Sequence, residues 1–211
     1  MKLKQLTAEL QKIDSFSKPK VHLEQYETPP ELASEMVFSA LQNEDICSDS
    51  RVVDLGCGTG MLGIGSVLCG ANYVLAIDID EDALSVAQGN VENILNKSVI
   101  DFMKADIRDL NFLCFKPAVN FDVAFINPPF GTKSRHADMN FLECASKTLG
   151  CRTIYSFHKG STRTHVLKAG TAFGFNKCQV LAECRFPIYQ TMRGHTKKCV
   201  DIDVDLIRFS H

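Results

Sequence analysis

Between residues 51 and 127 the sequence repeats one arrangement, in which a short apolar run ends at or just before a polar residue. The polar residues are Asp54, Asp78, Asp106 and Asn127. Short apolar runs that alternate with helical segments indicate a parallel sheet, because each return to the same edge needs a crossover. The carboxyl ends of parallel strands meet at one edge, so we expect these side chains to share a pocket.

The whole chain suits one domain of the α/β class. It has 211 residues, of which 45% are hydrophobic, and this is enough to bury one core. We expect residues 1–45 to form N-terminal helices that act as a lid over the site, and residues 46–211 to form the Rossmann-like core. Strands and helices alternate from Arg51 to about Gly174, without repeats or low-complexity segments.

The N-terminal region is predicted to contain two helices. Apolar residues recur at helical spacing from Leu3 to Ile13. The stretch from Thr28 to Glu31 fits a capping box with proline in the first turn, which predicts a second helix to about Leu41. Thr28 then has two interpretations, because it can cap this helix or form, with Gln25, the edge of a lid over a bound cofactor.

The end of the chain predicts two long strands joined by a loop, over Lys177 to Phe186 and Cys199 to Phe209. In the second strand Asp201, Asp203 and Asp205 alternate with apolar residues, which is typical of a half-exposed strand. Three acids spaced in this way could suggest a metal site. A solvated strand face explains them better, and we expect no metal.

A glycine-rich turn follows the first strand and opens a helix at Met61. Its residues are Asp54, Gly56, Gly58, Thr59 and Gly60. Glycines permit positive φ and a close approach of the backbone to a ligand. A dinucleotide-binding fold also places glycines here, so the turn alone leaves a nicotinamide-dependent oxidoreductase open. An acid directly before the glycines favours an S-adenosylmethionine (SAM) site. The residues of this turn and Met61 are assigned to the cofactor, as is Asn127 after a later strand.

Two further acids complete the predicted cofactor pocket. Asp78 ends the run from Tyr73 to Ile77, and a carboxylate there can accept both ribose hydroxyls of an adenosyl group. Asp106, after the third strand, can accept the adenine amino group. The neighbouring Ile79 and Ile107 are assigned to the same cofactor site. Asp80 instead fits the start of the next helix, where acids complement the helix dipole.

The most specific motif is Asn127-Pro128-Pro129-Phe130, after the apolar run from Val123 to Ile126. Such a loop can hold a planar, conjugated NH2 group, whose delocalised lone pair makes it a poor nucleophile. The Asn127 side-chain oxygen can accept one N–H bond and the Pro128 carbonyl the other. Phe130 offers a face for a flipped base, worth roughly 1–3 kcal/mol. The motif predicts methylation of an amino group, against the alternative of a rigid turn.

In this order the motifs resemble a class I SAM-dependent amino-methyltransferase. Several stretches narrow the resemblance to the methyltransferase-like protein five family and carry it over nearly the whole chain. They are Leu23-Glu-Gln-Tyr-Glu-Thr28, Asn127-Pro-Pro-Phe-Gly-Thr-Lys133, Tyr155-Ser-Phe-His-Lys159, Ser161-Thr-Arg163 and Val200 to Phe209. The resemblance implies a Rossmann-like, seven-stranded, mostly parallel sheet with an antiparallel C-terminal hairpin and helices on both faces. It also implies transfer of a methyl group to N6 of an adenosine in small-subunit (18S) ribosomal RNA.

The same resemblance implies a cofactor and a partner. SAM would be bound and S-adenosylhomocysteine released, with Gln25 and Thr28 also in contact with the cofactor. The family works as a heterodimer with a small zinc-binding activator of methyltransferases, inside the cell, in the nucleus, nucleolus and cytoplasm. The third strand is predicted to lie at a sheet edge, and an apolar edge invites strand addition. We therefore place the partner at Val99, Ile100, Phe102 and Met103.

The charge of the chain is −2, which by itself does not favour a nucleic-acid enzyme. The distribution is more informative, because basic residues fall in predicted loops near the Asn127 edge and can form a local rim for RNA phosphates. The residues assigned to this rim are Lys133, Arg135, His158, Lys159, Arg163, Lys197 and Lys198. For His158 a structural role is an equal alternative, and for the whole set the alternative is ordinary solvated charge.

Other function classes stay open at this point. A protein methyltransferase that acts on a glutamine amide uses a similar Asn-Pro-Pro-Tyr loop, although phenylalanine at position 130 favours a nucleobase. A non-catalytic RNA-binding relative is disfavoured because the motif is intact. The nine cysteines include no C-x-x-C pair, so a zinc knuckle is not expected, and we expect reduced thiols. Cys57 is expected to pack or to line the pocket.

Overall fold

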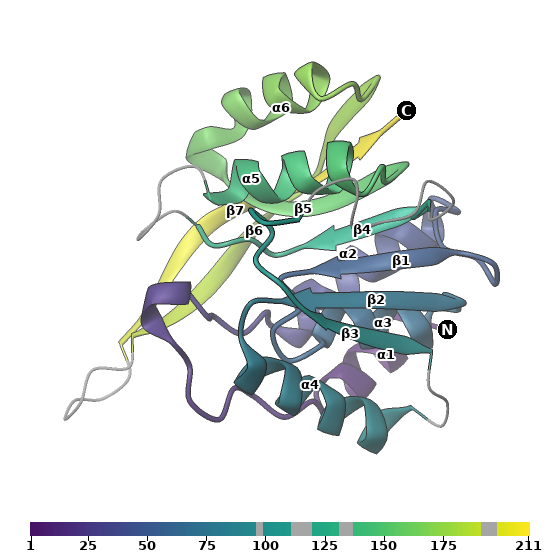
Figure 1. The fold of residues 1–211 in the computed structure, drawn as a ribbon. Coiled ribbons are helices and arrows are strands. Elements are labelled where there is room, and N and C mark those ends of the chain that lie inside the picture. Colours follow the sequence, from purple (N-terminus) through teal and green to yellow (C-terminus); the bar gives the residue numbers. More distant parts are fainter. Residues whose placement is uncertain (96–98, 111–119, 131–136, 191–197) are drawn as a thin grey trace.

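The computed structural model describes residues 1–95, 99–110, 120–130, 137–190 and 198–211. Its centre is a seven-stranded sheet in the order β3-β2-β1-β4-β5-β7-β6 (Figure 1). The strands are β1 (Arg51–Leu55), β2 (Tyr73–Asp78), β3 (Ile100–Lys104), β4 (Val123–Ile126), β5 (Thr153–Lys159), β6 (Lys177–Gln190) and β7 (Lys198–Ser210).

Strands β1 to β5 run parallel to one another, and β7 runs antiparallel to both β5 and β6. This topology confirms the predicted seven-stranded, mostly parallel sheet with an antiparallel C-terminal hairpin. Strand β4 is buried at all four positions, and β1 at four of its five. Strands covered on both faces need near-continuous apolar sequence, which explains why these runs were readable from the sequence.

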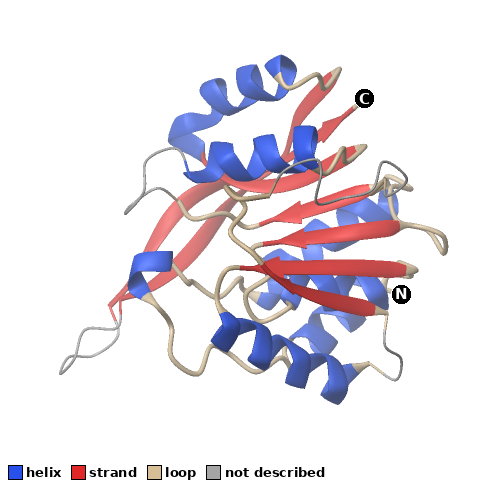
Figure 2. Ribbon diagram, viewed as in Figure 1, coloured by secondary structure: helices blue, strands red, loops and turns tan. Residues whose placement is uncertain are grey.

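Helices cover both faces of the sheet, as Figure 2 shows. One face packs on α1 (Leu3–Leu10), α2 (Pro30–Gln42), α3 (Met61–Leu68) and α4 (Glu81–Ile94). The other packs on α5 (Ala137–Glu143), its π-helical continuation η3 (Cys144–Thr148) and α6 (Arg163–Ala172). Short 3-10 turns are η1 (Val21–Leu23) and η4 (Gly160–Thr162).

The register brings the polar strand ends to one edge. Leu55 pairs with Ile77 on β2 and with Ile126 on β4, so the residues after β1, β2 and β4 emerge side by side. The last residue of β2, Asp78, pairs with Lys104 at the end of β3. The site therefore forms where the carboxyl ends of four adjacent strands meet.

Three local predictions differ from the structure. Helix α2 begins with Pro29 as its N-cap, without a side-chain cap, so Thr28 precedes the cap and the capping-box interpretation is wrong. The C-terminal strands extend beyond their predicted ends, to Gln190 in β6 and Ser210 in β7. Asp205 was expected on a solvated strand face, but it is 1% exposed.

Among the helices that the structure describes, none is both long and apolar enough to cross a membrane.

Candidate active site

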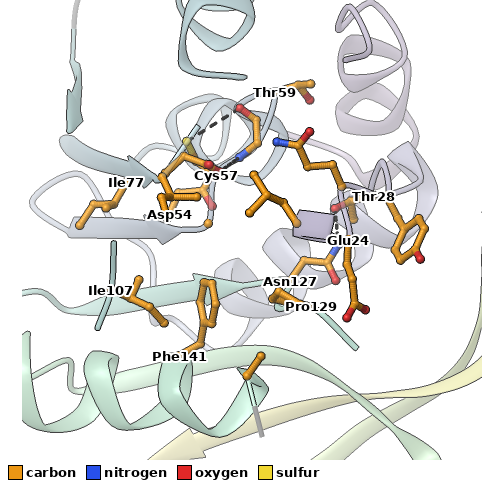
Figure 3. Close-up of a pocket in the computed structure, with 18 of the residues that line it drawn as sticks. Glu24, Thr28, Asp54, Cys57, Thr59, Ile77, Ile107, Asn127, Pro129 and Phe141 are labelled. Atoms are coloured by element: carbon orange, nitrogen blue, oxygen red, sulfur yellow. Dashed lines mark hydrogen bonds between the residues drawn. The ribbon is translucent and has the colours of Figure 1, made fainter. Parts of the chain in front are cut away.

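A cavity of about 310 Å³ lies at the carboxyl edge of the parallel strands (Figure 3). The structure brings Asp54, Asp78, Asp106 and Asn127 together in its wall, as their positions after β1 to β4 require. The segment before α2, from Phe16 to Thr28, supplies the opposite wall. The cavity is thus enclosed between the sheet edge and a strap of the N-terminal region.

The glycine turn after β1 is held against the end of β2. The amide of Gly58 donates a 2.8 Å hydrogen bond to Asp78 Oδ2, and the amides of Gly56 and Cys57 donate to the Ile77 carbonyl. Gly58 has a φ of 52°, and a Cβ there would lie 2.8 Å from the Phe16 ring. Glycine is therefore required by both backbone conformation and space.

Two carboxylates line the cavity beside the glycine turn, of which Asp54 is buried and Asp78 half-buried. Asp54 is 1% exposed and accepts a 2.7 Å hydrogen bond from the Gly63 amide. Burial raises its pKa to about 7, against the opposing effect of that hydrogen bond. Asp78 Oδ1 accepts from the Asp80 amide at 2.9 Å, and burial also raises the pKa of Asp78. Both groups prefer the protonated form more than an exposed aspartate does.

Asp106 lies nearer to solvent at the β3 side of the cavity. Its carboxylate accepts hydrogen bonds from the Arg108 side chain and from the Arg108 amide. The Arg108 guanidinium lowers the pKa of Asp106, so this acid is ionised at neutral pH. Ile79, which is 42% exposed, and Ile107 add apolar surface to the same wall.

Asn127 is oriented by the strap. Its Nδ2 donates a 2.8 Å hydrogen bond to the Thr28 hydroxyl. This bond fixes the orientation of the amide and leaves Oδ1 on the side opposite Thr28. That oxygen is buried and has no hydrogen-bond partner among the described residues. A buried acceptor without a donor costs free energy, so this atom fits a ligand N–H. Figure 3 shows Thr28 and Asn127 facing one another across the cavity end.

The strap is fixed to the sheet through Asp80. Gln25 Nε2 donates to Asp80 Oδ2 at 2.7 Å, and Lys20 Nζ pairs with Asp80 Oδ1 and with Asp82. Asp80 also caps α4 through the Asp82 amide, as predicted from the sequence. The Gln25 amide is thus engaged by protein groups, although Gln25 lines the cavity.

Some of the remaining residues of the predicted sites line the cavity, and others do not. Thr59, Met61 and Pro129 line the cavity beside those already described, whereas Gly60 is the N-cap of α3. Phe130 is buried, with its ring edge-on to Phe186 at 5.1 Å between centroids. Its stacking on a base stays a prediction.

His158 is a correction among the predicted RNA contacts. It is 1% exposed, and its Nδ1 lies 3.2 Å from Asp138 Oδ2, so its side chain cannot reach an RNA in this conformation. Arg163 forms a bidentate pair with the buried Asp205 and also contacts Glu183. Its charge is therefore largely compensated within the protein.

Of the remaining rim, Lys159 is half-buried at the end of β5, on the same edge as Asn127. Lys133, Arg135 and Lys197 lie outside the described residues, as does the side chain of Lys198. The predicted partner residues lie on the edge strand β3, except Val99, which precedes it. Ile100 is buried, and Phe102 and Met103 are half-buried.

Several cavity residues were missed by the sequence analysis, among them Phe16, Phe141 and Glu24. Phe16 lies over Gly58, and Phe141 of α5 lies against Gly56, where a Cβ would be 2.8 Å from its ring. No motif in the sequence around either phenylalanine indicates the site. Each residue contacts the glycine turn only because the folded chain brings it there. Glu24 stands within a stretch that carried the resemblance, but no role was assigned to it.

Comparisons with known proteins agree with this geometry. The family model described as "Conserved hypothetical protein 95" matches residues 29–171. The rRNA N(6)-adenosine-methyltransferase METTL5 of Danio rerio is 40% identical over 100% of this chain and 99% of its own. The corresponding Drosophila melanogaster enzyme is 40% identical over 99% of this chain and 96% of its own. The structure of a candidate RNA methyltransferase from Pyrococcus horikoshii superposes on this protein with a TM-score of 0.85 and 32% sequence identity. The match covers 100% of this chain and 98% of that one.

Fold and site define the protein as a class I SAM-dependent methyltransferase. The full-length identity to the animal enzymes is decisive for the narrower assignment. The chain belongs to the family of rRNA N(6)-adenosine-methyltransferases that METTL5 represents, which confirms the resemblance drawn from its motifs.

Proposed function

We propose that this protein transfers a methyl group from SAM to the exocyclic N6 of an adenosine in small-subunit (18S) ribosomal RNA. The observation that carries the proposal is the Asn127 amide in the cavity wall, which Thr28 orients and whose buried Oδ1 has no hydrogen-bond partner among the described residues. The adenine amino group has two N–H donors and no competing acceptor on that nitrogen. The names of the animal relatives support an adenosine of ribosomal RNA as the source of this amine.

The residues of the cavity fit SAM by the chemistry of their donor set. The glycine turn presents backbone to the cavity, and the Phe141 and Phe16 rings pack where side chains at Gly56 and Gly58 would otherwise stand. Asp78 would accept the ribose hydroxyls and Asp106 the adenine amino group, with Ile79 and Ile107 against the ring. When bound, SAM supplies a methyl group activated by its sulfonium.

The protein contributes chiefly by positioning. Asn127 Oδ1 would accept one amino hydrogen and the Pro128 carbonyl the other, which aims the nitrogen lone pair along the line of transfer. Binding both hydrogens also draws the nitrogen towards a tetrahedral geometry. Holding two reactants in an aligned geometry can remove several kcal/mol, about 7–11 in favourable cases, from a barrier.

The RNA is proposed to approach across the edge that carries Asn127. Lys159 lies at that edge. The segments 131–136 and 191–197, which lie outside the described residues, carry further basic residues in the sequence. A base would leave its stack and enter the cavity, while phosphates would contact the basic rim. We place the protein in the nucleus, nucleolus and cytoplasm, where such RNA is made and used.

A small zinc-binding activator subunit is proposed to pair with β3. This strand is the outer strand of the sheet on the β2 side, so within the described part of the chain no strand pairs with the outward backbone groups of its residues. Phe102 and Met103 contribute half-buried apolar surface beside it. Backbone pairing with an added strand, supported by such side chains, would give a heterodimer.

The test is a methyl-transfer assay with labelled SAM, run with and without the co-expressed activator. Small-subunit rRNA, large-subunit rRNA and a protein extract are offered in parallel. Label on small-subunit rRNA that is recovered as N6-methyladenosine supports the proposal. Label on protein alone would overturn it in favour of the glutamine amide, which the Asn127 loop could hold in the same way.

A further inference from the structure

Glu24 is a buried carboxylate in the wall of the cavity. Only 6% of it is exposed, although acidic side chains are seldom so deeply buried. It lines the cavity together with Thr28, Asn127 and Pro129. Figure 3 shows these four residues gathered at one end, well separated from Asp54 at the other. Glu24 therefore belongs to the part of the cavity that would receive the target amine.

The backbone holds Glu24 in an unusual conformation. Its φ and ψ of 53° and 42° lie in the left-handed region, which residues with a side chain rarely adopt. Two short-range hydrogen bonds fix this turn, from the Glu24 amide to the Val21 carbonyl at 3.1 Å and from the Tyr26 amide to the Glu24 carbonyl at 2.8 Å. A strained residue that its surroundings hold in place is a reasonable pointer to function.

The other acids of the cavity lie after β1, β2 and β3, on the cofactor side of the sheet edge. Asp54 accepts from the Gly63 amide, Asp78 from the glycine turn, and Asp106 from Arg108. Glu24 comes instead from the strap and faces the end of β4. Among the described residues that line the cavity, it is the only carboxylate on the Asn127 side.

Methyl transfer brings a positive charge to this end of the cavity. The nitrogen lone pair forms the new N–C bond, and the S–C bond breaks with its electron pair left on sulfur. The sulfonium thereby becomes a neutral thioether, while the nitrogen carries the positive charge until it releases a proton. A carboxylate placed beside that nitrogen stabilises the developing charge, and it accepts the proton when one of the two hydrogens leaves its first acceptor, Asn127 Oδ1 or the Pro128 carbonyl.

We propose that Glu24 is a catalytic residue, which stabilises the positive charge on the newly methylated nitrogen and accepts its proton. This inference rests on the proposed function, because it takes an amino group held by Asn127 as the target. It adds a chemical role to the strap, whose residues Gln25 and Thr28 were assigned only to binding.

The test compares Glu24→Gln with Glu27→Gln. Both changes remove one negative charge from the same strap at constant size, but Glu27 is exposed and bonds to Ser15 outside the cavity. Single-turnover methylation of small-subunit rRNA is measured at saturating SAM, with SAM affinity measured separately by calorimetry. We expect Glu24→Gln to slow transfer by about 100-fold, at the lower end for loss of a general base. SAM affinity and the Glu27→Gln rate should change little.

The pH dependence separates a chemical role from a structural one. The rate of the unsubstituted enzyme should fall on acidification as a carboxylate is protonated, and this fall should be absent from the residual rate of Glu24→Gln. Equal rates for the two enzymes, or loss of SAM binding in Glu24→Gln, would overturn the role of Glu24. No N6-methyladenosine with the unsubstituted chain would instead overturn the proposed function, and the Glu24 role with it.

Discussion

The side chain of Asn127 donates a 2.8 Å hydrogen bond to the hydroxyl of Thr28, which lies 99 positions earlier in the chain. One residue follows the β4 strand, and the other ends the strap before α2. The bond fixes which end of the Asn127 amide faces the cavity. Orientation of the proposed amine acceptor therefore depends on the N-terminal strap being closed over the site.

Thr28→Ala should slow methyl transfer more than it weakens SAM binding. The change leaves the Asn127 amide without its partner, and a hydrogen bond of this kind is worth about 1 kcal/mol net, or roughly fivefold in rate. Thr28→Ser keeps the hydroxyl and is the matched control. The measurement is turnover at saturating SAM, together with the SAM dissociation constant. Equal loss in the alanine and serine variants would contradict this role of the hydroxyl.

Asn127→Ala should abolish most methylation while SAM still binds. The variant removes the oxygen proposed to accept the amine hydrogen, and losing one such preorganised group typically costs on the order of 100-fold or more in rate. Methylated adenosine is quantified after digestion, and SAM binding is followed by thermal shift. Asn72→Ala, at an exposed position outside the cavity, should behave as the unsubstituted protein. Normal turnover in Asn127→Ala would contradict the amine-pocket argument.

Asp78→Ala should weaken SAM binding before it affects transfer. The carboxylate is proposed to accept the ribose hydroxyls, and only its ionised form accepts from both. Burial raises the pKa of Asp78, so the carboxylate becomes protonated earlier on acidification than an exposed aspartate does. SAM affinity should therefore begin to fall at a higher pH as the solution is made more acidic. Calorimetric titration across a pH series checks this, with the exposed Asp49→Ala as control. Unchanged affinity in Asp78→Ala would mean that another carboxylate binds the ribose.

Asp54 should make the fold less stable in alkaline solution. Its pKa is about 7 in the folded protein against 3.8 in the unfolded chain, so the folded state binds the proton more tightly. The resulting stabilisation is fully present below pH 3.8 and is lost as pH rises through about 7, with a limit of about 1.4 kcal/mol per pH unit.

Asp54→Asn keeps an acceptor for the Gly63 amide and removes the titration. Urea unfolding of both proteins at pH 5.5 and pH 8.5 measures the effect. The free energy of unfolding of the asparagine variant, minus that of the unsubstituted protein, should be greater at pH 8.5 than at pH 5.5. A difference that does not change with pH would contradict a raised pKa for Asp54.

The sequence allowed the gathering of Asp54, Asp78 and Asp106 at one edge of the sheet to be predicted, since each ends or follows an apolar run. That these residues bind the cofactor stays a prediction. Strand register then places such residues together without further information. The contacts of Thr28, Glu24 and Phe141 could not be predicted in the same way. They depend on how the strap and α5 pack over the sheet edge, and that packing leaves no periodic signal in the sequence.

Asp205 and His158 show the same limit at the C-terminal strands. Alternation of acids along β7 indicated one solvated face, and Asp201 and Asp203 are exposed, but Asp205 is buried in a pair with Arg163 at the start of α6. His158, which is followed by the basic Lys159 in the sequence, is buried on β5 beside Asp138 of α5. Local charge patterns report the composition of a strand, whereas burial depends on which helix returns to cover it.

Phe102→Glu should prevent assembly with the proposed activator subunit. Phe102 lies on the edge strand β3, where a charge would oppose the approach of an apolar added strand. The neighbouring Ile100 is less suitable, because it is buried in the core and a charge there would unfold the protein. Val200→Glu introduces the same charge at an apolar position of β7 that is 46% exposed, and it serves as control. Co-purification with the activator and molar mass by light scattering give the readout. A folded Phe102→Glu variant that still forms the heterodimer would place the partner on another surface.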